Sequence, residues 1–408
     1  MELFQTDSLQ SASEKLLSYM SAIPETKTVE LIQAEGQVLA EDIQSSAPIP
    51  HFRRSTVDGY AVISRDVQGA SENVPAFLEC IGEVQIGQNA GFSLVSGQCV
   101  YVPTGGMLPK EADAVIMVEY CEAFSLQNIA VYASISTGRN VVSIGEDVAA
   151  NAVLLKKGTT LAPAAVGVLA SAGISRVLIY APLKITIIST GDELVASDQV
   201  PAMGQVRDIN TYALEALAKK RDFTVVATHV LPDSEEVIRE TVVASMQTSD
   251  LVIISGGSSQ GKKDLTARIF DAVAEPGVFV HGLSMKPGKP TILAYDKKSS
   301  TVLFGLPGHP AAAMIIFELL VVGGRNKWIG KCDGKYVYAK MKMNMGSAPG
   351  KTTCQLVRLE DFAGEYVAEP IFGKSGMMSV LAAADGYILI DMNKEGLQKD
   401  EIVKVFFM

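Results

Sequence analysis

Apolar and polar positions follow two alternating patterns along the central part of the chain. Between about residues 183 and 322, short β-branched runs alternate with longer amphipathic stretches, which predicts strands and helices in turn. The predicted strands are residues 185–189, 224–230, 251–255, 278–281 and 302–305, and the predicted helices are residues 211–221, 234–246, 265–273 and 311–322. This order is typical of a doubly wound α/β domain.

The segments on either side of this region have other patterns. Leucines at helical spacing after Ser8 predict a first helix that ends near Ile23, and a second helix is predicted over residues 29–40. Residues 74–142, and again residues 331–408, break into short β-type runs separated by glycine-bearing turns. We therefore expect a small β domain before the α/β domain and a β-barrel or sandwich after it.

Composition and charge narrow the functional classes. The chain has 408 residues, 48% of them hydrophobic, so at about 150 residues per domain it has room for two to four domains. A net charge of -10 and a pI of about 5.1 argue against nucleic acid as the main partner. The five cysteines are scattered without a C-x-x-C pair, which argues against a disulfide framework or a zinc site and indicates a reduced, cytoplasmic protein. No secretory pattern and no membrane-spanning apolar run is present in the sequence.

Five polar loops are expected at one edge of the predicted sheet. Ligands of doubly wound domains bind outside the carboxyl ends of the strands, so loops at this edge carry the most functional weight. The five loops are residues 189–194, 207–210, 255–264, 284–290 and 306–313. Helix starts predicted at Asn210, Asp264 and Pro310 would offer unpaired backbone N–H groups, which favour an anion. This edge is therefore a candidate site for a phosphorylated compound.

The loop from Ser255 to Asp264, SGGSSQGKKD, begins where a buried strand is predicted to end. Its glycines free the backbone to approach a ligand, so we interpret it as an anion-binding turn. Lys286 and Lys289 are each followed by proline, and they would add positive charges at conformationally restricted positions. These features predict ligands for phosphate or another oxyanion.

Four acids are expected at the same edge, namely Asp192, Glu193, Asp208 and Asp264. Carboxylates gathered there would suit Mg²⁺, which bridges to phosphate oxygens. The structural alternative is that the acids cap helices and carry surface charge. Because all five loops are predicted at one edge, we favour a binding site.

Two turns in the first β-rich region have both a structural and a functional interpretation. Asp58, close to Arg53 and Arg54, fits a solvated turn with a local ion pair. Thr104 and Gly105 lie on a turn that suits either a hairpin-like connection or contact with a ligand. From spacing alone, the structural interpretation is the better supported one.

The same choice arises for two later turns. The adjacent Glu146 and Asp147 fit either a metal site or exposed turn carboxylates, and the structural interpretation is again favoured. Ser375 either caps a turn or reaches a ligand from the C-terminal region.

Seven motifs, in order along the whole chain, resemble those of the molybdenum insertases, the family of the bacterial molybdopterin molybdenumtransferase MoeA and the gephyrin E domain. They are STVDGYAV from Ser55, PTGGMLPKEADAVIMVE from Pro103, GED from Gly145, TGDEL from Thr190, SGGSSQGKKD from Ser255, KPGKP from Lys286 and LPGHPAAA from Leu306. A single glycine loop would not be specific, because adenylylating relatives share it. The ordered set is specific.

The resemblance implies a multidomain α/β plus β fold in elongated subunits of a homodimer. Residues 1–45 and 140–180 would form an N-terminal helical and extended domain, and residues 46–139 an inserted small β domain. Residues 181–327 would form the doubly wound, molybdopterin-binding α/β domain, and residues 328–408 a β-barrel-like domain.

The resemblance also implies a reaction. Adenylylated molybdopterin and molybdate would be the substrates, with tungstate as the alternative oxyanion. Mg²⁺ would be required, and cleavage of the phosphoanhydride would release AMP. A transient contact with the molybdopterin adenylyltransferase is a further implied partner.

Residue roles follow from the matching motifs. The implied catalytic residues are Asp58, Asp147, Asp208, Asp264, Lys286 and Lys289. The implied metal ligands are Glu193, Asp208 and Asp264. The implied cofactor-binding residues are Thr104, Gly105, Ser255, Gly256, Gly257, Ser259, Gly261, Pro307, Gly308, His309 and Ser375. The residues from the N-terminal half and from the α/β domain are expected to meet across the dimer.

The sequence departs from the family pattern at a few positions. Val142 stands where the family has an arginine shortly before Gly-Glu-Asp, and Arg139 is a candidate replacement. The family's Gly-Asn-Pro reads Gly-His-Pro here, with His309 in the middle. These changes bear on the choice of oxyanion and on pterin affinity more than on the fold.

Two other functions stay open at this point. One is a noncatalytic pterin- or anion-binding scaffold, against which the retained acids and lysines argue. The other is adenylyl transfer to molybdopterin, against which the flanking domains argue. An NAD-dependent dehydrogenase is disfavoured because no predicted strand leads into G-x-G-x-x-G.

Overall fold

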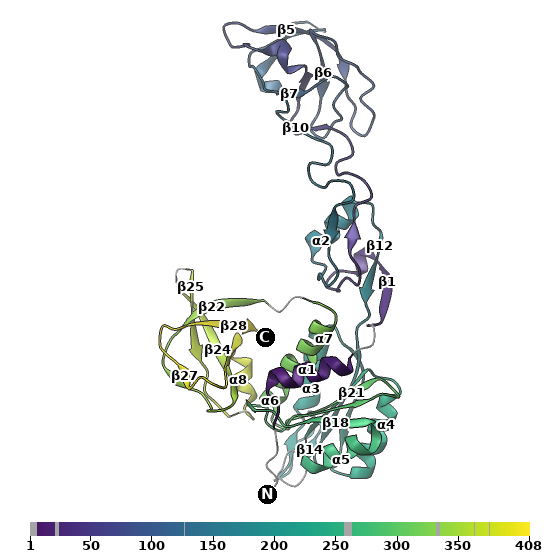
Figure 1. Cartoon of the computed structure of the whole chain (residues 1–408). Coiled ribbons are helices and arrows are strands. Elements are labelled where there is room, and N and C mark those ends of the chain that lie inside the picture. Colours follow the sequence, from purple (N-terminus) through teal and green to yellow (C-terminus); the bar gives the residue numbers. More distant parts are fainter. Residues whose placement is uncertain are drawn as a thin grey trace. The chain divides into compact units, whose positions relative to one another are not determined.

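The computed structural model describes residues 6–20, 24–125, 127–256, 263–331, 335–362, 364–374 and 376–408, with the backbone alone for residues 263 and 264. The chain forms two compact units. One consists of residues 28–157 and 161–177, and the other of residues 1–27, 158–160 and 178–408. The chain passes from one unit to the other within strands β1 (Thr26–Glu30) and β12 (Arg176–Tyr180) (Figure 1).

A six-stranded sheet organises the larger unit. Its strand order is β16–β13–β17–β21–β20–β18, with bounds Thr224–Leu231, Lys184–Thr190, Leu251–Gly256, Thr301–Leu306, Ile292–Asp296 and Pro276–His281. The first four strands are parallel, and β20 runs antiparallel to both of its neighbours. The predicted central α/β fold is therefore confirmed.

Helices cover both faces of this sheet (Figure 1). Ile187 and Ile253 point into one core with α1 (Leu9–Tyr19), α3 (Asn210–Lys220) and α6 (Pro310–Ile316). Their neighbours Ile188 and Ile254 point into a second core with α4 (Glu235–Met246) and α5 (Lys263–Val273). Because alternate residues of one strand face opposite sides, continuous apolar strands are what a doubly covered sheet requires.

Strand β20 was not predicted from the sequence. It forms a hairpin with β21, and the turn between them is held by Asp296. The Asp296 carboxylate accepts hydrogen bonds from the backbone N–H of Ser299 at 2.8 Å and from its hydroxyl at 2.7 Å. These bonds lower the pKa of Asp296 even though burial opposes ionisation.

The helix predicted over residues 29–40 is wrong. The structure has the end of β1 there, followed by the single 3₁₀ turn η1 (Leu31–Gln33). Backbone donors that a helix would use internally bond elsewhere, since Leu31 N–H donates to Ser175 O at 2.8 Å and Gly36 N–H to Leu161 O at 2.8 Å. Gly36 also has a φ of 78°, which a helix does not allow.

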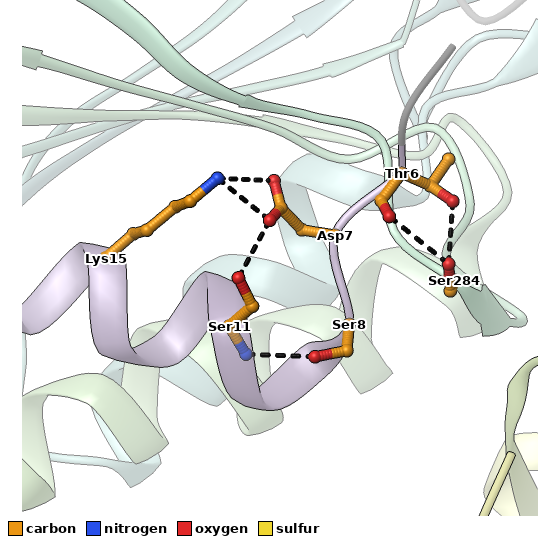
Figure 2. Close-up of polar contacts among 6 residues, drawn as sticks. All are labelled: Thr6, Asp7, Ser8, Ser11, Lys15 and Ser284. Atoms are coloured by element: carbon orange, nitrogen blue, oxygen red, sulfur yellow. Dashed lines mark hydrogen bonds and ion pairs between the residues drawn. The ribbon is translucent and has the colours of Figure 1, made fainter. Parts of the chain in front are cut away.

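The first predicted helix is confirmed as α1 (Leu9–Tyr19), although it ends before Ile23. Ser8 caps it, because its hydroxyl oxygen accepts from Ser11 N–H at 3.0 Å (Figure 2). Ala12 and Leu16 are fully buried in the core of the α/β sheet. This helix therefore fixes the start of the chain to the α/β domain.

The C-terminal region of the same unit is a closed five-stranded barrel. A barrel was one of the two predicted alternatives, the other being a sandwich. The ring order is β24–β25–β22–β28–β26, with bounds Thr352–Phe362, Glu365–Pro370, Tyr336–Met341, Ile402–Phe407 and Gly386–Ile390. The ring closes because β26 pairs with both β28 and β24. A short strand, β19 (Met285–Lys286), adds to the start of β24.

The smaller unit contains the predicted small β region. Its six-stranded sheet has the order β7–β4–β6–β5–β9–β8, with bounds Ala114–Met117, Gly59–Val62, Gln98–Val102, Ala76–Glu83, Asn128–Val131 and Cys121–Ala123. Short pairs continue the unit, including β3 (Arg54–Ser55) with β10 (Val141–Val142). The finer division into four domains stays a prediction. None of the helices in the described parts of either unit has the length and apolarity needed to cross a bilayer.

Candidate functional site

A buried polar network lies at the carboxyl edge of the α/β sheet. Asn210, the first residue of α3, donates from Nδ2 to Ser255 Oγ at 2.8 Å and to Gly308 O at 2.9 Å. Ser255 Oγ donates in turn to Pro307 O at 3.3 Å. One amide group therefore joins three of the loops that the sequence predicted at this edge.

Two oxygen atoms at this edge, one on Asp208 and one on Asn210, have no hydrogen-bond partner among the described residues. The side chains of Asp208 and Asn210 are only 4% and 8% exposed. Asp208 Oδ1 accepts from Thr211 N–H at 3.2 Å, whereas Asp208 Oδ2 and Asn210 Oδ1 accept no hydrogen bond from the described residues. Because a buried acceptor without a donor destabilises the fold, these two oxygens suit a bound cation or a ligand N–H or O–H group.

The contacts of Asn210 fix which way its amide points. Gly308 O can only accept, so the atom facing it must be the Nδ2 donor. Nothing in the sequence analysis singled out this side chain, because only the backbone N–H groups of its helix were considered. Its position at the start of a helix, at the carboxyl edge of the sheet, could have indicated a functional role for the side chain.

The last residue of β17 lies close to the last residue of β13. Gly256 has a φ of 135°, and a Cβ atom there would lie 2.2 Å from Thr190 O. Beside it, Thr211 Oγ1 donates to Ser189 Oγ at 2.8 Å. Only glycine fits at position 256, because the backbone of the neighbouring strand is so close. That the segment after it binds an anion stays a prediction. Gly257, Ser259 and Gly261, together with the Asp264 side chain, lie outside what the structure describes.

The two candidate lysines lie on the loop between β18 and β20. Lys286 and Lys289 are both exposed. Gly288, between them, packs against α6, since a Cβ atom there would lie 2.4 Å from Ile316 Cδ1. This loop is therefore seated on the helix that follows Gly308 and His309, at the same edge of the sheet as the polar network.

His309 is exposed and lies next to the C-terminal barrel. Its Cδ2 atom would be 3.7 Å from a Cβ atom placed at Gly376. Ser375, the predicted ligand in that segment, is outside the described residues. The structure therefore places Gly376, the neighbour of Ser375, beside His309 in the predicted loop 306–313.

The predicted metal ligands do not form a cluster in the part of the chain that is described. Glu193 is exposed, and its carboxylate lies over Gly191, 2.9 Å from where a Cβ atom would stand. Asp192 Oδ1 instead accepts from Asp233 N–H at 3.0 Å. Across the described residues no group of three His, Cys, Asp or Glu side chains is close enough to hold a metal ion. The grouping of Glu193, Asp208 and Asp264 stays a prediction.

Asp58 and Thr104 are brought together in the smaller unit. Asp58 Oδ1 accepts from Thr104 N–H at 2.7 Å and from Thr104 Oγ1 at 3.0 Å. Arg53 donates to Ala112 O at 2.7 Å. In place of the predicted ion pair, Arg53 and Asp58 therefore have separate partners, Ala112 and Thr104. Gly105 has a φ of 81° and completes the turn. Both Asp58 and Thr104 stay exposed, as a ligand contact would need.

Asp147 lies in a turn that is held by its backbone. Its N–H donates to Ile49 O at 3.1 Å, and the neighbouring Glu146 carboxylate accepts from Ser143 N–H at 2.7 Å. Glu146 therefore stabilises the turn, whereas the Asp147 side chain is exposed. Val142, which precedes this turn, lies directly opposite Arg54 in the β10–β3 pair, so a guanidinium group is present on that strand pair.

Comparison with known proteins adds independent information. Three family profiles match successive parts of the chain: the MoeA N-terminal region (domains I and II) at residues 7–173, a probable molybdopterin binding domain at 186–324, and the MoeA C-terminal region (domain IV) at 338–407.

Individual relatives match over nearly the whole length. A putative molybdopterin biosynthesis protein of Methanocaldococcus jannaschii is 33% identical, with 97% of this chain and 95% of the relative covered. A molybdopterin molybdenumtransferase of Haemophilus influenzae is 30% identical, with 97% of each covered. The crystal structure of a molybdopterin biosynthesis MoeA protein from Pyrococcus horikoshii has a TM-score of 0.82 at 33% identity, with 99% of both chains covered.

Proposed function

The chain belongs to the MoeA family of molybdopterin molybdenumtransferases, and from this premise we propose the reaction that it catalyses. We propose that it inserts molybdenum from molybdate into adenylylated molybdopterin, in a Mg²⁺-dependent step that cleaves the phosphoanhydride and releases AMP. The observation that supports this most is a pair of buried oxygens, on Asp208 and Asn210, that no described residue satisfies. They lie at the same sheet edge as Lys286 and Lys289.

The residues at this edge fit Mg²⁺. The ion prefers hard oxygen ligands and keeps several waters, so one carboxylate and one amide oxygen are a suitable partial set. Asp208 Oδ2 and Asn210 Oδ1 would hold it, and we propose Asp264 and Glu193 as further ligands, directly or through water. When bound, the ion would supply positive charge to phosphate oxygens.

We assign complementary roles to the remaining residues of the α/β domain. Lys286 and Lys289 would hold the phosphates or the oxyanion as fixed positive charges. Gly256 lets the backbone approach the ligand, and the N-termini of α3 and α6 favour negative charge. We expect no protein nucleophile, so a positioned water would attack the anhydride.

The residues of the smaller unit are assigned to the other side of the site. We propose that the protein is a homodimer and that Asp58, Thr104 and Asp147 act on substrate bound by the α/β domain of the partner subunit. The support is that Asp58 and Thr104 form a fixed, exposed pair, which a structural role alone does not require.

The decisive experiment follows AMP release and pterin-bound metal. Purified protein is incubated with adenylylated molybdopterin, Mg²⁺ and either molybdate or tungstate. We expect AMP and pterin-bound molybdenum from the parent protein, and at least about a hundredfold slower AMP release from Asp264→Ala and Lys289→Ala variants that remain folded and dimeric. Pterin binding without AMP release under any condition would indicate a noncatalytic scaffold and would refute the proposal.

A further inference from the structure

The start of the chain runs beside the loop that carries the two lysines (Figure 2). Asp7 N–H donates to Gly282 O at 3.0 Å, and Ser284 N–H donates to Asp7 O at 2.7 Å. These bonds form a parallel β-bridge between Asp7 and Leu283. In addition, the hydroxyl groups of Thr6 and Ser284 are hydrogen-bonded at 2.6 Å. Residues at the beginning of the chain therefore contact the segment just ahead of Lys286.

A second segment, later in the sequence, holds the next residues of the loop. Met285 and Lys286 form strand β19, which pairs with Thr352 and Thr353 at the start of β24 in the barrel. Thr352 N–H also donates to Ser284 O at 2.9 Å. The backbone leading to Lys286 is therefore held at two successive points, first by the N-terminal segment and then by the barrel.

The N-terminal segment is itself anchored to the domain core. The Asp7 carboxylate accepts from Lys15 Nζ at 2.8 Å and from Ser11 Oγ at 2.8 Å, both in α1. Ser8 caps the same helix, and Leu16 of that helix is buried in the core of the α/β sheet. Asp7 is consequently held by α1 as well as by the loop it contacts.

We propose that Thr6 and Asp7 are positioning residues for Lys286 and Lys289. They fix the backbone from Gly282 to Ser284, so that the exposed lysines are held ready for the anion at less ordering cost. This inference rests on the proposed function, since it assigns the lysines to the substrate. It extends the site to a segment that contributes no side chain to the ligand.

A matched pair of substitutions at one position separates the backbone contact from the ion pair. Asp7→Pro removes the N–H that donates to Gly282 O, whereas Asp7→Ala keeps that N–H and removes only the carboxylate. Both variants lose the contact with Lys15, so their difference reports the bridge. Ser284→Ala is a third variant. It removes only the hydroxyl contact with Thr6 and, unlike the proline substitution, adds no constraint to the backbone.

The first readout is hydrogen exchange of residues 282–291 in the protein without substrate. We expect roughly tenfold faster exchange in Asp7→Pro than in Asp7→Ala, and an intermediate or small effect in Ser284→Ala. Equal exchange in Asp7→Pro and Asp7→Ala, with both folded by circular dichroism, would refute the positioning role. This measurement needs no substrate, so it stands even if the parent protein releases no AMP.

The second readout divides binding from chemistry. We expect KM for the adenylylated pterin to rise roughly tenfold in Asp7→Pro relative to Asp7→Ala while kcat changes less than about twofold, because the lysines hold the anion in both ground and transition states. A merely structural role would lower the active fraction, and so kcat, without changing KM. That result would overturn the inference, whereas absence of AMP release from the parent protein would overturn the proposed function instead.

Discussion

The side chain of Asn210 has two donors in use and one acceptor that no group of the described residues satisfies. Its donors connect loops that are separated by tens of residues, and Asn210 itself begins α3, where Asp208 accepts from Thr211 N–H. An apolar residue at this buried position would remove the penalty of that oxygen, but it would also remove the two hydrogen bonds that join the loops. The donated bonds account for an amide at this position, and we propose that a bound ligand satisfies the remaining oxygen.

Substitution of Asn210 by aspartate should test this role. The change keeps the shape and Oδ1 but places a second oxygen against Gly308 O, so we expect AMP release to fall at least about tenfold and Mg²⁺ affinity to change. Kinetics and calorimetric titration of Mg²⁺ measure the two effects.

The control for that substitution is Asn89→Asp. Asn89 is exposed in the smaller unit, and its Oδ1 accepts from Gly91 N–H at 3.2 Å, a contact that aspartate retains. We expect parent activity from this variant. An Asn210→Asp protein with parent kinetics and parent Mg²⁺ affinity would remove Asn210 from the site.

Individual residues of the site could be predicted only where a motif or the position in the chain indicated a role. Ser255 and Gly308 were predicted at one edge, and the structure joins them. Asn210 was missed because its role depends on partners 45 and 98 residues away, and no local pattern reveals such contacts. The contact between Asp58 and Thr104 could not be predicted for the same reason, since the two residues are 46 positions apart.

At the scale of secondary-structure elements, periodicity identified buried positions better than backbone conformation. Leu31, Ala34 and Val38 are buried at helical spacing, as the pattern indicated, yet the backbone there is a strand and a single turn. Strand β20 was not predicted. It has five residues and follows directly after the candidate lysine loop. The continuous apolar run of β17 and the amphipathic pattern of α4 were predicted nearly to the residue.

The cap of α1 gives an element-scale prediction. Ser8→Ala removes the acceptor for Ser11 N–H, so we expect the larger unit to lose about 1 kcal/mol in free energy of unfolding. Urea denaturation followed by circular dichroism measures the loss. Ser18→Ala is the matched control, because Ser18 is exposed in the same helix and its hydroxyl bonds only to Lys15 O. A loss of equal size in both variants would mean that capping is not its cause.

At the scale of the whole molecule, the division into two units predicts stepwise unfolding. Proteins with separate compact units commonly depart from a single cooperative transition. The described cysteines report on each unit, since Cys80, Cys99 and Cys121 belong to the smaller unit and Cys354 to the larger one.

Thiol labelling in a denaturant series should resolve these steps. Burial raises the pKa of Cys121 to about 12 and raises the pKa of Cys99 and Cys354 well above the usual range, so at pH 8 these thiols are protonated and shielded while the protein is folded. We expect Cys99 and Cys354 to become reactive at different urea concentrations, as read by mass spectrometry of labelled peptides. Coincident labelling curves would show that the two units unfold together.

The bridge between Asp7 and the lysine loop also has a consequence for how the protein is made. The hydroxyl contact between Thr6 and Ser284 spans 278 residues of sequence, and the second hold on the loop, at Thr352, comes later still. Domains generally fold in order as the chain leaves the ribosome, so the α/β sheet can form while the barrel is still being synthesised. The lysine loop receives its last support only when strand β24 has emerged. A translation product that stops before this strand would carry every catalytic residue proposed for the chain, yet its lysines would lack their final alignment.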